Sequence, residues 1–220
     1  MLKITVLVAA IGYFAALSVQ AAAAEKTTIG NARTVVKTVT GTLDANLRHI
    51  KLLDDIYHNE LIETGDESAT EFVFLDETKL ALGPNSSLIL DRFVYDPDPN
   101  KASFVMTATA GVFRFVSGKL PKKSYEIHTP TATIGIRGTV LSVIVIPGGM
   151  VGKPAKVNVT VEEGVAEITS CLGERVSLVR PGASTTVSMT SDGKCAAPTP
   201  PGARPAEFSE LLVTSGFERQ

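Results

Sequence analysis

The stretch from Tyr125 to Thr139, Tyr-Glu-Ile-His-Thr-Pro-Thr-Ala-Thr-Ile-Gly-Ile-Arg-Gly-Thr, constrains the fold more than any other part of this 220-residue chain. Its first residues alternate between apolar and polar, with the period of two that is typical of a half-buried β-strand. Pro130 lacks a backbone N–H and favours an extended conformation at Thr129, so strand pairing should lapse there. Beyond this hinge a second strand is predicted, with one face formed by Ala132, Ile134 and Ile136.

Arg137 lies between Gly135 and Gly138, and its position allows two interpretations. A guanidinium offers a planar fork of donors that suits an anion or a protein partner. Alternatively, the arginine pairs with a carboxylate at a strand end while its aliphatic stem covers apolar surface. The glycines mark a place where the chain bends or where another backbone approaches closely.

The rest of the chain repeats the pattern of short strands and turns, which predicts an all-β fold. The 18 glycines and 12 prolines are spread among valine, isoleucine and threonine, as expected for strands separated by turns. The apolar run 140–146 predicts a central strand that is covered on both faces. Turns are predicted at 83–86 and at 162–164. The strands follow no fixed period, so we expect an antiparallel β-sandwich or a β-roll or solenoid-like domain with a short C-terminal helix.

The chain divides into four expected parts. Residues 1–24 combine a basic start, an apolar run and four alanines, which predicts a signal peptide and hence a periplasmic or secreted protein. No later segment is predicted to span a membrane. Residues 25–48 form an N-terminal strand and lead-in, with a first strand over 32–40, and residues 49–195 form the β domain. Residues 196–220 form a proline-rich linker and a short helix, whose apolar stripe is expected to pack on the domain: Phe208, Leu211 and Leu212.

Two cysteines, Cys171 and Cys195, lie near the C-terminal end. In an oxidising compartment such a pair predicts a disulfide. Free thiols are the main alternative. A redox-active pair is disfavoured because no Cys-x-x-Cys spacing is present, and no histidine neighbours either cysteine to suggest a metal site.

Charge and composition limit the range of functions. A formal net charge of −2 with 20% charged residues is not the footprint of a nucleic-acid-binding protein. Two polar groups are candidates for acid–base chemistry: His128 with Glu126, which share a strand face, and His58 with Asp54, Asp55 and Glu60. Both groups are also typical of solvated strand or turn surface. We therefore assign no catalytic residue, metal or cofactor.

Four motifs together resemble the FecR-protein domain family of bacterial cell envelopes. They are Gly83-Pro-Asn-Ser86, Gly111-x-Phe-Arg-Phe-Val-Ser-Gly118, Thr129-Pro-x-Ala-x-Ile-Gly-Ile-Arg-Gly-Thr139 and Val159-x-Val-x-Glu-Gly164, followed by Val176-x-Leu-x-x-x-Gly182. Their order and spacing span roughly residues 55–190. We take three polar residues in these motifs as candidate binding residues: Arg137, Arg114 and Asn85.

The resemblance implies an exported, β-rich domain that interacts with a protein or a ligand and has no catalytic residues. In the best-known members it relays a signal from an outer-membrane receptor to a cytoplasmic sigma factor, through a cytoplasmic N-terminal segment and a transmembrane helix. We expect a stand-alone exported member without that anti-sigma segment. The first hypothesis is therefore a non-catalytic binding or scaffold module for an envelope protein or glycan, with a role in envelope signalling. The alternative is an envelope hydrolase with an unrecognised site.

Overall fold

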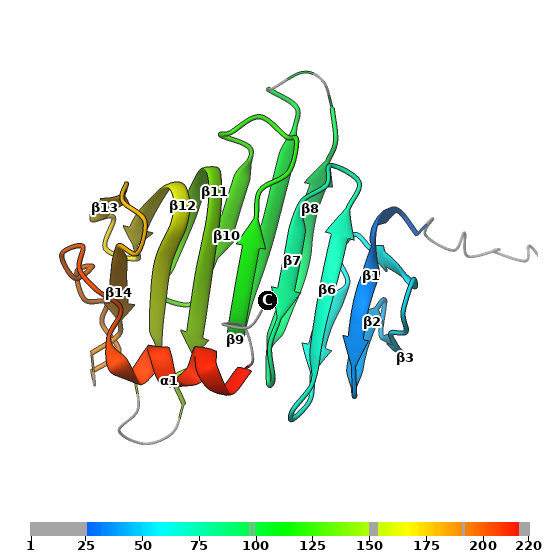
Figure 1. Cartoon of the computed structure of the whole chain (residues 1–220), viewed down its shortest axis with the longest axis horizontal. Helices are drawn as coiled ribbons and strands as arrows, with labels where there is room; N and C mark the ends of the chain where they lie inside the picture. The colour runs from blue at the N-terminus through cyan, green and yellow to red at the C-terminus, as the bar shows by residue number, and fades with distance from the viewer. Residues whose placement is uncertain (1–25, 97, 99, 150–153, 191, 216–220) are drawn as a thin grey trace, which may run out of the picture.

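The computed structural model describes residues 26–215 except 97, 99, 150–153 and 191, and only the backbone of 212–215. The predicted signal peptide lies outside the described residues. Fourteen strands in the described part join into one hydrogen-bonded sheet, which confirms the all-β prediction. In Figure 1 the strands run side by side along the long axis, from β1–β3 at one end to β13 and β14 at the other.

The sheet folds back on itself into two layers, because three long strands contribute one half to each. These strands are β9 (Ser103–Val116), β11 (Ala132–Ile146) and β12 (Lys156–Ser170). The first layer has the order β4, β1, β6, β7, then residues 111–116 of β9, 140–146 of β11 and 156–161 of β12, then β14. Its remaining strands are β1 (Thr28–Val36), β4 (Asp55–Tyr57), β6 (Ala69–Phe74), β7 (Lys79–Leu82) and β14 (Ser184–Ser188).

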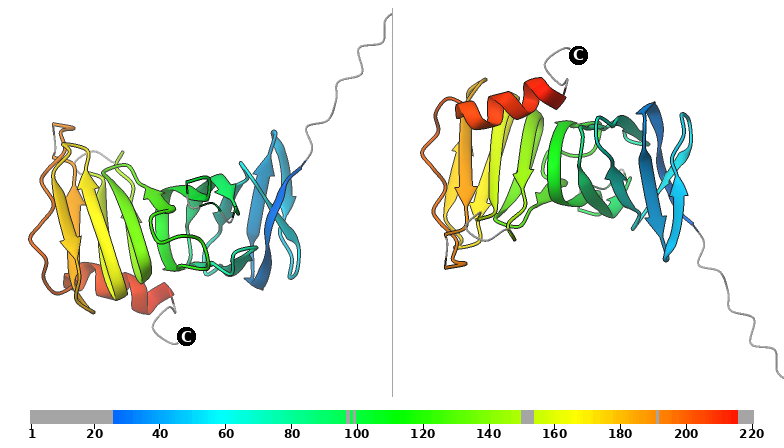
Figure 2. Two further views of the ribbon diagram at one scale, coloured as in Figure 1. Left: turned by 90° about the horizontal axis from the view of Figure 1, so that it is seen from above. Right: turned by 90° about the horizontal axis from the view of Figure 1, so that it is seen from below.

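The second layer has the order β3, β2, β5, β8, then residues 103–110 of β9, β10, 132–137 of β11, 165–170 of β12 and β13. Its remaining strands are β2 (Val39–Leu43), β3 (Asn46–His49), β5 (Leu61–Thr64), β8 (Ser87–Val94), β10 (Tyr125–His128) and β13 (Arg175–Leu178). The β9–β10 pair is parallel, and the other described pairs are antiparallel. The arrangement is a two-layered, sandwich-like roll, seen from above and below in Figure 2.

Glycines form the corners at which the long strands pass between the layers. Gly111, Gly138 and Gly164 have φ values of 109°, 66° and 84°, a backbone region that glycine occupies without the steric penalty other residues meet. A β-carbon at Gly164 would lie 2.0 Å from the carbonyl oxygen of Gly138. Two corners therefore pack directly on each other, and β11 and β12 bend together.

One apolar core fills the space between the layers. Phe74 and Phe115 enter it from the first layer, and Phe104 and Tyr125 from the second. The ring centroids of Phe104 lie 4.9 Å from Phe74 and 5.4 Å from Phe115, within the range of favourable aromatic pairs. These core contacts therefore hold β10 and the neighbouring strand β9 in position.

The C-terminal helix α1 (Ala206–Ser215) lies on the outer face of the first layer (Figure 2). Phe208 is fully buried there against Val112, Ile144 and Ile146, so the 140–146 strand is covered on both faces, as predicted. Leu211 remains partly exposed, and the side chain of Leu212 is outside the described part. Within that part, no helix has the length and apolar character that a membrane span needs.

The proline-rich segment before α1 pairs with the edge of the first layer. The N–H of Ala196 donates to the carbonyl of Ser188, and the N–H of Thr199 to that of Thr186, over 2.8 and 2.9 Å. Gly202 forms a β-bridge with Ser184. The segment that composition predicts as a linker therefore extends the sheet and covers the edge of β14.

Candidate functional site

The 125–139 stretch forms β10, a tight connection and the first half of β11, as its alternation predicts. Tyr125 and Ile127 are buried, whereas Glu126 and His128 face outward. The β10–β11 ladder ends with His128 and Thr133, and at Thr129 both the N–H and the hydroxyl donate to the carbonyl of Ala132, over 2.9 and 2.7 Å. The outward residues of β10, β11 and β12 therefore form one continuous polar face on the second layer.

A hollow of about 260 Å³ lies in the middle of this face. Its floor is Gly135, which is the direct cross-strand neighbour of Glu126 on one side and of Glu167 on the other. Since Gly135 has no side chain, the two carboxylates flank a gap. We call it the Gly135 hollow, and its lining is Lys123, Tyr125, Glu126, Thr133, Gly135, Ile136, Arg137, Glu167 and Thr169.

Both signs of charge occur around the Gly135 hollow. Arg137 lies 3.5 Å from Glu167, and Arg175 lies 3.7 Å from the other oxygen of the same carboxylate. His128 lies 2.5 Å from Glu126. Each of these side chains is at least one third exposed, so the pairs contribute little to stability and are free to exchange partners. The face around the hollow therefore carries both carboxylates and cationic side chains.

A buried hydrogen-bond cluster supports the hollow from below. The hydroxyl of Tyr125 donates to Asp76 over 2.8 Å and accepts from the N–H of Leu120 over 2.9 Å. Asp76 also accepts from the backbone N–H and the hydroxyl of Thr78. Burial is the largest cause that raises the pKa of the Tyr125 hydroxyl well above its usual range, so this group stays a donor. The cluster ties β10 to the β6–β7 connection and fixes the position of the polar face.

The three candidate binding residues do not lie together. Arg137 borders the Gly135 hollow on the second layer. Arg114 lies on the outer face of the first layer, where its Nε donates to Glu162 over 3.1 Å. Asn85 has a φ of 52° in the turn after β7 and borders a separate apolar groove beside Leu211. Of the three, Arg137 is the one that faces a polar hollow, and it also makes the carboxylate pair that the alternative interpretation expects.

The two groups considered for acid–base chemistry differ in their surroundings. Glu126 and His128 form an open, half-exposed pair, unlike the enclosed sites in which catalytic groups are usually tuned. In the second group, the fully buried carboxylate of Glu60 accepts from Arg48 Nε over 2.8 Å and from the N–H of Tyr57 over 3.0 Å. This carboxylate is therefore held in a structural ion pair.

Comparison with known proteins identifies the central part of the fold. Residues 60–167 match the family model described as FecR protein. The chain carries a FecR domain. The domain runs from β5 to β12 and contains all but one residue of the Gly135 hollow, while β1–β4, β13, β14 and α1 flank it.

Two crystal structures from Parabacteroides distasonis ATCC 8503, each described as a "putative anti-sigma factor", resemble the chain. The first is 14% identical with a TM-score of 0.50, and the alignment covers 70% of this chain and 63% of that one. The second is 13% identical with a TM-score of 0.48, covering 70% and 64%. The first comparison shows a shared fold. No curated protein matches the sequence.

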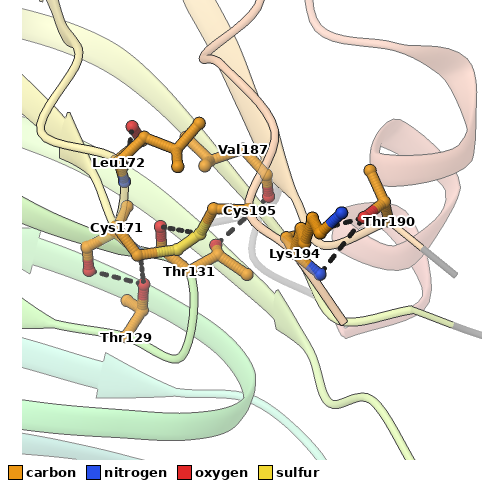
Figure 3. The surroundings of a disulfide bond; sticks show 10 residues. Thr129, Thr131, Cys171, Leu172, Val187, Thr190, Lys194 and Cys195 are labelled. Atoms are coloured by element: carbon orange, nitrogen blue, oxygen red, sulfur yellow. Dashed lines mark hydrogen bonds between the residues drawn. A yellow bond between two sulfur atoms is a disulfide. The ribbon is translucent and has the colours of Figure 1, made fainter. Parts of the chain in front are cut away.

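A disulfide closes the region just beyond the FecR domain, as the cysteine pair predicts. Cys171 and Cys195 are bonded, with Cα atoms 5.9 Å apart. In Figure 3 Thr131, which follows Pro130 in the tight connection, lies beside the bridge. The N–H of Cys171 donates to the carbonyl of Thr131 over 3.1 Å, and the hydroxyl of Thr131 donates to the carbonyl of Val187 over 3.2 Å. The disulfide therefore holds the β12–β13 turn, the β10–β11 connection and β14 at one place.

Replacing both cysteines with serine is expected to lower the free energy of unfolding by about 3 kcal/mol. In the chain-entropy model this is the effect of a closed loop of this length, because the bridge restricts the unfolded chain. Chemical denaturation of both forms measures the difference. Equal stability of the two forms would contradict a structural role for the bridge.

Proposed function

We propose that this protein is a non-catalytic, exported FecR-domain module that binds a protein partner in the cell envelope and takes part in envelope signalling. The Gly135 hollow and the polar face around Arg137 are the proposed contact surface. The FecR domain supports this assignment, and so does the fold shared with a protein that is described as a "putative anti-sigma factor".

The observation that carries the contact surface is the glycine at position 135. A β-carbon there would meet no atom closer than 3.8 Å, and Gly135 has no positive φ. Neither crowding nor backbone conformation therefore requires glycine, although glycine weakens a strand interior. Close approach of a partner from outside is a remaining physical reason for glycine in a strand.

Replacing Gly135 with valine tests this surface. The β-branched side chain fits the strand and fills the hollow, so we expect unchanged or slightly higher stability together with at least a roughly tenfold loss of partner affinity. The partner is first identified by cross-linking in intact cells, and its affinity is then measured by calorimetry. Undiminished affinity of a folded Gly135→Val protein would remove the hollow from the contact surface.

The hydrolase alternative rests on the close Glu126–His128 pair. It is tested with the purified protein on peptide, ester and glycan substrates. Turnover that disappears in a folded His128→Ala variant would replace the binding proposal. We expect no turnover, because the pair lies open to water on a strand face.

A further inference from the structure

The two layers have four edges, and three of them are covered or tied. The edge of β14 is covered by residues 196–202, as described above. At the opposite end Arg48 of β3 reaches across and donates to the carbonyl of Asp55 in β4 over 2.5 Å, which links the two edges. The remaining edge is β13. Exposed edge strands are the surfaces on which further strands add.

The turn before β13 determines which of its backbone groups face outward. The N–H of Ser170 donates to the carbonyl of Glu174, and the N–H of Gly173 to that of Ser170, each over 2.8 Å. Because antiparallel bonds alternate along a strand, Val176 and Leu178 then bond to β12, while Arg175 and Ser177 direct their N–H and C=O groups away from it. Within the described part of the chain, no hydrogen bond to these four outward groups is found.

We propose that β13 pairs in antiparallel fashion with β13 of a second copy of this chain, so that the second layers of two molecules become continuous. With the twofold axis at Val176, Arg175 of one copy lies opposite Ser177 of the other. Each such pair exchanges two bonds, so all the outward groups find a partner. The strand is self-complementary in this register, as a twofold interface requires.

The side chains fit the same register. Arg175, on the outer face, lies opposite a serine and not opposite another arginine. Val176 is half-buried at the open end of the core and meets Val176 of the second copy across a close, non-hydrogen-bonded pair. Leu172 and Val179 flank the strand at its two ends and are 58% and 60% exposed. The twofold axis places Leu172 of one copy near Val179 of the other.

A four-residue edge makes a small interface, so we expect a dimer that dissociates on dilution. Sedimentation of the purified protein over a roughly hundredfold range of concentration should show this change. A Ser177→Pro variant should stay monomeric, because it loses an outward N–H and none of the bonds to β12. Ser177→Ala keeps the N–H and should dimerise like the wild type. Thermal melting checks that both variants fold.

Hydrogen exchange of the wild type gives a second test that needs no variant. The amides of Arg175 and Ser177 should exchange several-fold faster after dilution, while that of Val176, which bonds to β12, should change little. A protein that stays monomeric at the highest concentration would overturn the proposal. So would a dimer that persists in Ser177→Pro or that leaves these two amides unprotected.

Discussion

Alanine at Gly164 is expected to destabilise the protein by about 3 to 5 kcal/mol, which corresponds to a melting temperature lower by roughly 10 °C. Two effects add. The residue has a φ of 84°, a conformation that costs alanine about 1 to 2 kcal/mol. The new methyl group would also lie 2.0 Å from the Gly138 carbonyl oxygen and 2.9 Å from the Cα of Thr139, so the backbone must move.

Gly173 is a matched control for this substitution. Its φ is 83°, but nothing lies within 4 Å of the position of a β-carbon. Gly173→Ala should therefore show the conformational cost alone, about 1 to 2 kcal/mol. Thermal and denaturant unfolding of both variants separates the two effects. Equal losses would mean that the contact between the two corners does not hold the layers together.

Removing Arg48 is expected to cost about 3 to 5 kcal/mol, because it leaves the carboxylate of Glu60 buried without its cation. Glu60 is fully buried, and Arg48 contacts it through Nε and Nη2 over 2.8 and 3.1 Å. A β-carbon at Gly41 would lie 2.1 Å from Glu60 Oε1, so there is little room for the carboxylate to move. Denaturant unfolding of Arg48→Ala measures the loss.

The control for Arg48→Ala is Arg137→Ala, which breaks an exposed pair. The Arg137 side chain is 52% exposed and its Nη2 lies 3.5 Å from Glu167, so the expected loss is under about 1 kcal/mol. Glu60→Gln in the Arg48→Ala background should recover part of the stability, since it removes the unpaired charge. If both arginine variants lose the same free energy of unfolding, the buried Arg48–Glu60 pair does not stabilise the fold more than an exposed pair does.

Local patterns predicted most strands but not the way in which they connect. The alternation that begins at Tyr125 and the apolar run 140–146 correspond to β10 and to the second half of β11. The predicted first strand, 32–40, is wrong in its bounds, because a positive φ at Lys37 separates β1 from β2. The sequence predicts a turn between two strands at 162–164, whereas these residues form a corner within β12. A glycine with positive φ serves a chain reversal and a bend between layers equally well, so sequence alone does not separate them.

The candidate site was predictable where it depends on alternation along one strand. Burial of Tyr125 and exposure of Glu126 follow from the period of two. The partner of Tyr125, by contrast, is Asp76, 49 residues away, and that of Glu60 is Arg48, 12 residues away. Such pairs depend on strand order, which local periodicity does not contain. The register that places Gly135 between Glu126 and Glu167 could not be predicted from the sequence for the same reason.

Photo-cross-linking in intact cells tests whether the face around the Gly135 hollow contacts a protein in the envelope. A photoreactive amino acid replaces Thr133, which lines the hollow. In a second strain it replaces Arg114, on the outer face of the opposite layer. We predict an adduct with one envelope protein from position 133, lost when Gly135→Val is added, and none from position 114. An adduct from position 114 alone, or one from 133 that persists with Gly135→Val, would show that the Gly135 hollow is not the contact surface.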